Sequence, residues 1–539
     1  MKSIIFKVSV IITLTFLLCL HHYGHNLGSR GDVHMRKLPI FYNALLLTGV
    51  NLVLRLVSTS FQVFISSRIG AGGVGLVQLV MSVAAMSMTA GTAGIRTATM
   101  YLTAEELGKR RPENVIWILS GCVRYSLIFS LSVAAVVYAA APWIASVWIG
   151  DVRTVDAIRL FAVFLPVSCL SGMMIGYFTA ASRITTLAAV EVVEQLCSMA
   201  VTASALIFWA KEDASRACQA MVLGGCAGAC LTLCALVILR LLERQKAGER
   251  LPVRHRLTTI ALPLALADDL KVGINTTENI MVPKRLALYS GADAMAQFGT
   301  VCGMVFPVMM FPAAILYGLA DLLIPEMARC NASESKIRIR YLARRSLRLA
   351  LFYGVTCGGI LFLIASPLCQ RLYKSQEAGM YLRWYALIVP MLYCDAIIDA
   401  INKGLGQQRI CVGINIFTSV MDVVGLYFLL PRWGMKGYFL SFLITHGVNV
   451  VLSIVLLLKV TQLRVPLSVP LLAGASALTS LLVASFASVT WIKVAIYLIL
   501  CFSFLIFTDV LHLEDIWWLL QLTGIKKSKK KTDFLKNNI

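Results

Sequence analysis

The sequence predicts an all-α polytopic membrane protein with about fourteen transmembrane helices. Of its 539 residues, 58% are hydrophobic and only 14% are charged, and the mean hydropathy is +0.79. Apolar runs of about twenty residues recur along the whole chain, and a helix of that length crosses a hydrocarbon core of about 30 Å. Short polar links separate the runs. These observations exclude a water-soluble globular domain.

The apolar runs also predict how the chain is divided. A first set of about six spans precedes the longest basic link, and about eight spans follow it. The predicted spans are 40–66, 75–102, 116–142, 157–181, 186–209, 217–241, 258–282, 295–323, 346–368, 380–402, 410–430, 436–458, 467–487 and 494–513. The predicted parts are an apolar extension (1–34), a six-helix bundle (35–241), a basic cytoplasmic link (242–257), a second six-helix bundle (258–459), two additional helices (460–513) and a basic cytoplasmic tail (514–539).

The first 34 residues resemble a signal peptide that lacks a cleavage site. "MKSIIFKVSVIITLTFLLCL" has a basic start and an apolar core, but no small-x-small cleavage site follows it. A second possible start, Met35, directly precedes the first span of the main body. We therefore expect 1–34 to be either an extra anchor helix or an over-extended gene start.

The basic residues predict orientation, because Lys and Arg in short loops stay on the cytoplasmic side. They gather at 109–111, in the links 240–256 and 329–348, and in the tail. Both termini of the main body are therefore expected in the cytoplasm, with the protein in the cell membrane. The net charge of +22 is spread over many loops, which argues against a nucleic-acid partner. Anionic lipid headgroups could bind the tail lysines, or the tail could be solvated and only fix topology; these lysines are Lys526, Lys527, Lys529, Lys530 and Lys531.

The two sets of spans contain similar motifs at corresponding positions. "GYFTAASR" (176–183) ends a span and leads through a tight cytoplasmic turn, and "KGLGQQR" (403–409) does the same in the second set. Such internal repetition is typical of transporters in which two bundles rock about a central site. Prolines inside spans add points where a helix can kink: Pro166, Pro263, Pro307, Pro312 and Pro390. The pattern therefore favours alternating access.

Four stretches carry a resemblance to a known family. "SSRIGAGGVGLVQLV" (66–80), "TAGIRTATMYLTAEE" (92–106), "GYFTAASRITTLAAVEVVEQ" (176–195) and "KGLGQQRICVGIN" (403–415) resemble the stage V sporulation protein B and polysaccharide-exporter branch of the multidrug/oligosaccharidyl-lipid/polysaccharide (MOP) flippase superfamily. The resemblance implies two six-helix bundles in a V, plus two C-terminal helices. It also implies that a lipid-linked oligosaccharide or peptidoglycan precursor is moved from the cytoplasmic to the outer leaflet, for envelope polysaccharide or spore cortex synthesis, with a relationship to lipid II flippases.

Three arginines at membrane depth are the candidate substrate-binding residues: Arg55, Arg96 and Arg124. A lipid-linked sugar has a pyrophosphate, and the planar guanidinium pairs bidentately with phosphate oxygens. An unpaired charge inside a span costs at least about 2.5–3.5 kcal/mol, so each arginine must face a cavity, a carboxylate or a headgroup.

Each arginine has an alternative. Arg124 lies early in its span and could snorkel to the headgroups. Arg96 could have a structural carboxylate partner. For Arg55, the resemblance implies a cavity position, although lipid II flippases carry a further arginine where this chain has Phe61.

Carboxylates inside the spans form the second half of the predicted site. Glu191 and Glu194 share a helix face, and "ALADDLKVGIN" brings Asp268, Asp269 and Lys271 together; Asp395 and Asp399 form a third set. They could pair with the arginines when the site is empty, or bind H⁺ or Na⁺ to drive the cycle. The alternative is a set of permanent ion pairs between helices.

The sequence contains no catalytic or metal-binding spacing, and we expect a monomer that is not an enzyme and has no cofactor beyond a possible H⁺ or Na⁺. Two other functions stay open. A cation-coupled multidrug exporter of the same superfamily would need an anionic, aromatic pocket. A polyprenyl-linked glycan ligase or polymerase would need large outer loops, and the predicted ones are short. An assembly factor for a sporulation complex is a further alternative.

Overall fold

The computed structural model describes residues 40–507, apart from residues 110, 182, 211, 212, 243–252 and 464–467. The predictions for 1–34 and for the tail lysines lie outside the described residues. Within the described part, the chain is helical and contains no strand. The protein is thus the all-α, multi-pass membrane protein that the sequence predicts.

The first half of the described chain forms α2 (Ile40–Thr92), α3 (Ile95–Gly108), α4 (Val115–Trp143), α5 (Val155–Ala180), α6 (Ile184–Ala205) and α7 (Ala214–Leu242). The second half forms α8 (Val253–Ser290), α9 (Ala294–Thr300), α10 (Phe306–Met310), α11 (Ala313–Ala332), α12 (Lys336–Tyr373), α13 (Gln376–Ala386), α14 (Val389–Gly404), α15 (Gln408–Thr461), α16 (Ser468–Ser485) and α17 (Thr490–Phe507). Short π-helical segments continue some of them, including η2 (Ile144–Ile149), η4 (Leu206–Ala210) and η6 (Val301–Val305).

Two of these helices are each a pair of spans. α2 has 53 residues and α15 has 54, so each would be about 80 Å long if straight, far more than a membrane needs. Each is broken at a glycine with positive φ, at Gly70 (φ 70°) and Gly434 (φ 53°). By length and apolar composition, nine helices of the described chain could cross a membrane, or up to eleven if two bent pairs count as spans. The arrangement fits fourteen spans without confirming that count.

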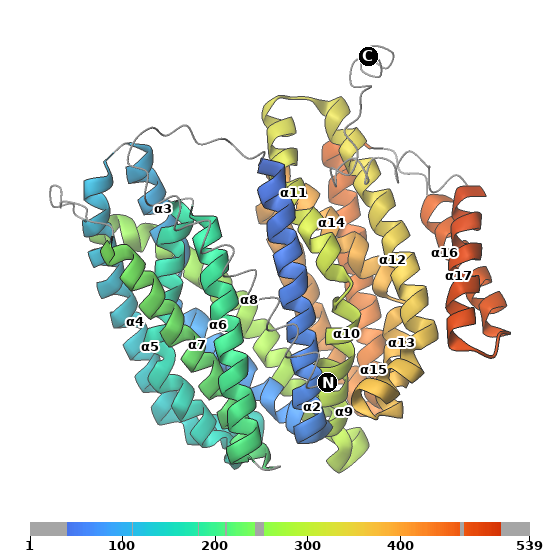
Figure 1. Cartoon of the computed structure of the whole chain (residues 1–539), viewed down its shortest axis with the longest axis horizontal. Coiled ribbons are helices and arrows are strands. Elements are labelled where there is room, and N and C mark those ends of the chain that lie inside the picture. The colour runs from blue at the N-terminus through green and yellow to red at the C-terminus, as the bar shows by residue number, and fades with distance from the viewer. Residues whose placement is uncertain are drawn as a thin grey trace.

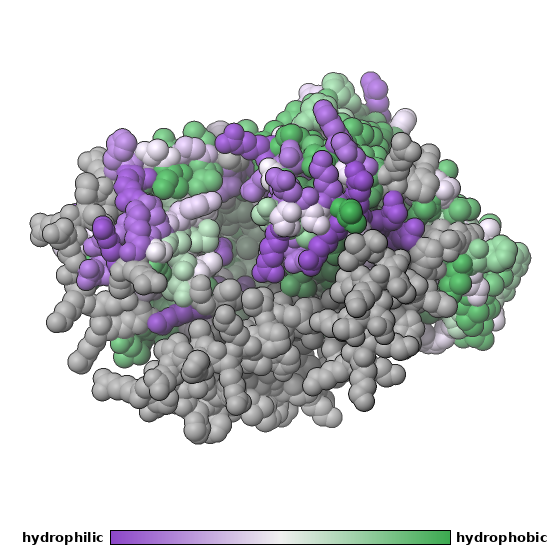
Figure 2. All heavy atoms as spheres, turned by 90° about the horizontal axis from the view of Figure 1, so that it is seen from above, coloured by the Kyte–Doolittle hydropathy of each residue, from purple (hydrophilic) through white to green (hydrophobic). Residues whose placement is uncertain are grey.

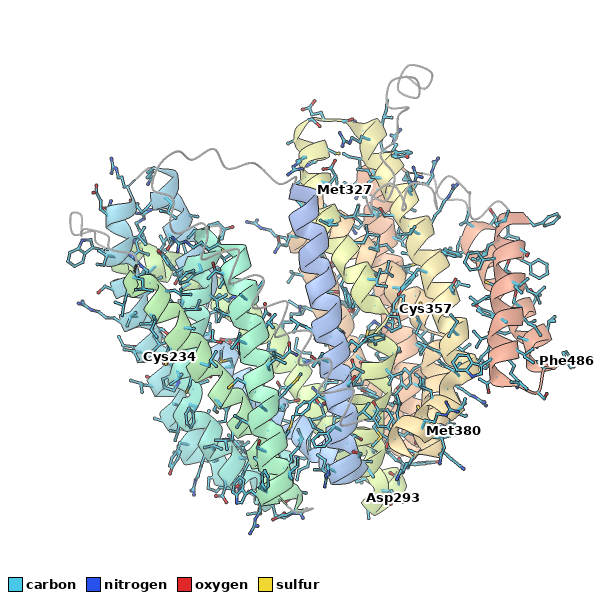
Figure 3. The ribbon with its side chains drawn as sticks, viewed as in Figure 1. Cys234, Asp293, Met327, Cys357, Met380 and Phe486 are labelled. Carbon is cyan, nitrogen blue, oxygen red and sulfur yellow. The ribbon has the colours of Figure 1, made fainter. Side chains whose placement is uncertain are left out.

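The helices form two bundles that meet at one end and separate at the other, with α3–α7 in one and α9–α15 in the other (Figure 1). The largest hydrophobic core runs along the second bundle, as far as Met327 near the open end (Figure 3), and reaches the first bundle where the two meet. It joins Val80 of α2 and Ile158 of α5 to Phe298 of α9 and Leu430 of α15. A separate core fills the other half of the first bundle and includes Ile95 and Tyr177. The joint between the bundles is therefore closed at one end only.

Two helices pass from one bundle to the other. α8 begins with Leu257 and Ala261 in the core of the first bundle, and its later Leu286 lies in the core shared with the second. The first helix of α2 runs the opposite way, from a contact with Tyr317 of α11 to Ile65 in a core with residues of α6, η4 and α7. The sequence did not predict this crossing, because hydropathy carries no information about which bundle a helix packs against.

The last two helices form a separate pair on the outer side of the second bundle (Figure 1). Tyr497 of α17 packs where Gly359 of α12 has no side chain, and its hydroxyl donates to the carbonyl of Val355 at 2.8 Å. Phe486, in the turn between α16 and α17, points away from the protein (Figure 3) and is 90% exposed. An exposed phenylalanine is compatible with a membrane surface.

Candidate site between the two bundles

Glycines allow the two bundles to touch at the closed end. A Cβ on Gly299 of α9 would lie 2.0 Å from the carbonyl oxygen of Ala71, and one on Gly75 would lie 2.5 Å from the carbonyl oxygen of Met295. Backbone thus lies directly on backbone between α2 and α9. Lys284 of α8 also donates a hydrogen bond to the carbonyl of Val147 in η2, which adds a polar contact at the same joint.

The opposite end is hollow. Seen from that end, the surface sinks between the two bundles, and hydrophilic side chains surround the depression (Figure 2). A charged side chain that is exposed within a span must face such an aqueous space or extend to the headgroups, since lipid would not solvate it. The predicted arginines and carboxylates can be placed relative to this hollow.

Arg55 lies on the helix that crosses between the bundles. It is exposed, and its guanidinium lies over the Tyr317 ring, 5.9 Å from the centroid. One turn further along α2, Ser58 accepts a hydrogen bond from Gln195 of α6. Glu191 is one turn before Gln195 on α6, on the same face and at the level of Arg55. Arg55 is thus flanked by both bundles, and it makes no ion pair with another described residue.

Arg96 follows a sharp break in the second helix. Ala93 (φ 44°) and Gly94 (φ 70°) interrupt the helix, and Tyr125 donates to the carbonyl of Ala93 at 3.1 Å. The backbone of Arg96 lies directly on Gly176 of α5, where a Cβ would come within 2.3 Å of its carbonyl oxygen. The Arg96 side chain is exposed. Its backbone is therefore fixed while its guanidinium is available to a ligand.

The structure does not bring Arg96 into an ion pair with another described residue. Glu194 instead accepts a hydrogen bond from Thr232 of α7 at 2.6 Å, inside the first bundle. Glu191 is exposed. The two glutamates share one helix but have different surroundings.

Arg124 lies on a different surface. It is exposed on α4, and Ile128 and Leu131, which follow it on the same face, are 65% and 55% exposed. A face with exposed isoleucine and leucine is typical of a lipid contact. This location favours the snorkelling alternative for Arg124.

Asp269 lines a cavity between the bundles. The cavity has a volume of about 350 Å³ and is bounded by Met86 of α2, residues of α8, and Val420 and Val424 of α15. The Oδ1 of Asp269 is buried and accepts no hydrogen bond from another described residue. Asp268 and Lys271 are exposed. One carboxylate therefore faces an otherwise apolar cavity.

The two aspartates of α14 have separate roles in packing. Asp395 accepts a hydrogen bond from Asn449 of α15 at 2.8 Å, and Asn449 accepts one from Thr418 at 3.4 Å. Asp399 forms a local ion pair with Lys403 at 2.5 Å. Asp395 thus links helices of the second bundle, whereas Asp399 does not.

The sequence analysis missed a pair of carboxyl groups. Glu278 of α8 lies next to Asp422 of α15. Ser441 and Thr445 donate to Oδ1 of Asp422 at 2.6 and 3.3 Å. Two carboxylates in contact repel each other when both are ionised, so this arrangement favours a shared proton or a cation between the two groups. Asp422 stands alone in an apolar run, whereas Glu278 lies in the polar stretch "NTTEN" (275–279), and only the fold brings the two together.

No family model matches the chain. Stage V sporulation protein B of Bacillus subtilis (strain 168) is 22% identical over 419 residues, which cover 75% of this chain and 80% of that protein. A solved structure of the lipid II flippase MurJ in an inward closed conformation has a TM-score of 0.65 and 12% identity, and covers 86% of this chain and 99% of that one. An inward-facing multidrug resistance MATE family transporter of the MOP superfamily has a TM-score of 0.61 and 15% identity, and covers 78% of this chain and 97% of that one. These findings confirm the resemblance that the four sequence stretches predicted.

Proposed function

Since the chain is a homologue of stage V sporulation protein B and has the fold of the MOP superfamily, we propose that it is a flippase for a lipid-linked oligosaccharide or peptidoglycan precursor. It moves this lipid from the cytoplasmic to the outer leaflet by alternating access, for envelope polysaccharide or spore cortex synthesis. The observation that carries the proposal is the pair of exposed arginines inside spans, Arg55 and Arg96, in a fold whose two bundles separate at one end only.

The arginines bind the pyrophosphate. A guanidinium keeps its charge and offers paired donors to phosphate oxygens. Arg55 lies on the helix that crosses between the bundles, beside Tyr317 of α11, and Arg96 follows the break at Gly94 in the first bundle. On this proposal one pyrophosphate contacts both arginines and so links the two moving parts. When the site is empty, Glu191 is the carboxylate that pairs with Arg55, because it lies at the same level on α6.

On this proposal, the open end of the protein faces the cytoplasm. In this state the bundles separate at the end of the basic links, and the glycine contacts between α2 and α9 close the outer end. Both termini of the main body are cytoplasmic. The protein acts as a monomer, and its basic loops contact anionic lipids.

The carboxyl pair Glu278–Asp422 is the candidate coupling site for H⁺ or Na⁺. It joins α8, which starts in the first bundle, to α15 of the second bundle. A proton or cation bound there stabilises the contact between these helices, and its release weakens that contact. Asp268, Asp269, Lys271, Asp395 and Asp399 are secondary candidates for ion coupling or for pairing between helices.

A second function is favoured by one observation. The cavity beside Asp269 is apolar apart from a few groups, and its buried carboxylate oxygen has no hydrogen-bond partner among the described residues. Such a cavity suits an amphipathic cation, as a cation-coupled multidrug exporter would require. The exposed Arg55 and Arg96 in the hollow favour an anionic substrate instead.

The proposed function is tested with purified protein in liposomes that contain a fluorescent undecaprenyl-pyrophosphate-linked sugar in both leaflets. A membrane-impermeant reagent that destroys the outer fluorophore measures exchange between leaflets. Protein-dependent loss of the protected fraction supports the proposal. If liposomes with and without the protein behave alike for several sugars, while a fluorescent amphipathic cation is transported, the second function replaces the first.

A further inference from the structure

The flank of α11 that faces α2 carries two exposed side chains, Tyr317 and Asp321, one helical turn apart. The opposite face of α11 is buried in the second bundle, through Leu316, Ala320, Leu323 and Met327. Apart from the Tyr317 hydroxyl, which donates to the sulfur of Met310 at 3.9 Å, the flank contributes little to packing and is open to a ligand.

The contact with Arg55 shows which side of α11 faces the crossing helix of α2. The Arg55 guanidinium is 5.9 Å from the centre of the Tyr317 ring, so the ring lies beside the candidate pyrophosphate site. Tyr317 remains 40% exposed, which leaves much of the ring uncovered. An aromatic ring at this position offers a flat apolar surface next to a cation.

Asp321 adds an acceptor to the same flank. Its side chain is exposed, and it forms no ion pair with another described residue. A carboxylate that is exposed within an apolar helix faces water rather than lipid, so Asp321 faces the hollow. The negative charge of the Asp321 carboxylate repels a phosphate group, whereas its oxygens accept hydrogen bonds from hydroxyl groups.

We propose that Tyr317 and Asp321 form the subsite for the first sugar of the lipid-linked substrate, an inference that rests on the proposed function. The sugar's C–H face packs on the Tyr317 ring, and a hydroxyl donates to the Asp321 carboxylate. Repulsion by Asp321 keeps the pyrophosphate on the arginine side, so the headgroup binds in one orientation. The two residues thus select for a sugar attached to the pyrophosphate.

Binding of two probes tests this subsite. One is undecaprenyl pyrophosphate without a sugar, and the other is undecaprenyl pyrophosphate linked to N-acetylglucosamine, each titrated against the full chain in lipid nanodiscs. We expect Tyr317→Ala and Asp321→Asn to weaken binding of the sugar-bearing probe about tenfold, the loss typical of one hydrogen bond to a charged group or one stacking contact. Binding of the sugar-free probe should stay within about twofold of wild type, and Tyr317→Phe should keep the affinity for both probes.

A matched control is available in Tyr138→Ala. Tyr138 is also exposed and lies beside an arginine, with the Arg159 guanidinium 5.3 Å from its ring centre, but on α4 and α5 of the first bundle. This variant should bind both probes like wild type.

The outcomes separate the inference from the proposed function. If wild type binds neither probe, both are overturned. If wild type binds the two probes equally and the Tyr317 and Asp321 variants change neither, the subsite is refuted and the flippase proposal stands. An equal loss for both probes in these variants would also refute the subsite, because it would assign the residues to the pyrophosphate or to folding.

Discussion

Gly299→Ala should prevent full closure of the end where the two bundles meet. The new methyl group would lie 2.0 Å from the carbonyl oxygen of Ala71 and 2.6 Å from the backbone nitrogen of Gly75. Carbon contacts below about 3 Å are not tolerated, so α2 and α9 must separate by about 1 Å. Backbone atoms on the opposite helix cannot rotate away as a side chain can.

The energetic effect follows from this overlap. Overpacking a close contact costs about 1–3 kcal/mol. The cost applies only to the state in which this end is closed, so the equilibrium should shift towards the state in which it is open by about fivefold to more than a hundredfold. Gly72→Ala is the matched control, because Gly72 lies on α2, the helix that Gly299 contacts, and no atom would lie within 4 Å of a Cβ at that position.

The shift can be measured as a distance between spin labels at positions 152 and 293, which are both exposed in turns at the closed end. The exposed Cys234 is replaced by serine to avoid background labelling. In Gly299→Ala the distance distribution should move to longer values, with the melting temperature close to that of the control. Identical distributions for Gly299→Ala and Gly72→Ala would refute the closed-end interpretation of the glycine contacts.

Three other predictions follow from the structure. Asp422→Asn should reduce the ion dependence of transport by about tenfold or more, because the amide cannot share a proton with Glu278, and transport with unchanged ion dependence would remove the pair from the coupling site. Cysteines at 246 and 335 should react with an impermeant thiol reagent only from the cytoplasmic side, and one at the exposed Trp433 only from outside; any reversal would contradict the proposed topology. A chain that starts at Met35 should insert and transport like the full chain, and loss of transport at normal abundance would assign a function to residues 1–34.

Hydropathy was enough to predict the all-α membrane class, because the span pattern depends on local composition alone. Hydropathy also identified Arg55 and Arg96 as candidate site residues, because a charged residue inside an apolar run can be recognised from the sequence alone. The break before Arg96 was not predicted, because it requires a positive φ at Ala93, a residue without that preference.

Contacts between residues that are far apart in the chain could not be predicted from the sequence. Nothing in the spacing of Glu278 and Asp422 indicates that they touch, and the transfer of α8 between bundles is a property of packing. The surroundings of single side chains on α4 and α11 also required the structure. Arg124 of α4 lies beside the exposed Ile128, whereas Tyr317 of α11 lies beside Arg55.

The central claim is that Arg55 and Arg96 bind the pyrophosphate of a lipid that the protein moves between leaflets. The most direct measurement is the rate of leaflet exchange of an undecaprenyl-pyrophosphate-linked sugar in liposomes containing wild type, Arg96→Ala, Arg96→Lys or Arg216→Ala. Arg216 is exposed near the closed end and serves as the charge-matched control. Arg96→Ala should abolish exchange, Arg96→Lys should restore it in part because lysine lacks the paired donors, and Arg216→Ala should match wild type. Exchange at the wild-type rate by Arg96→Ala, at equal protein density, would contradict the account.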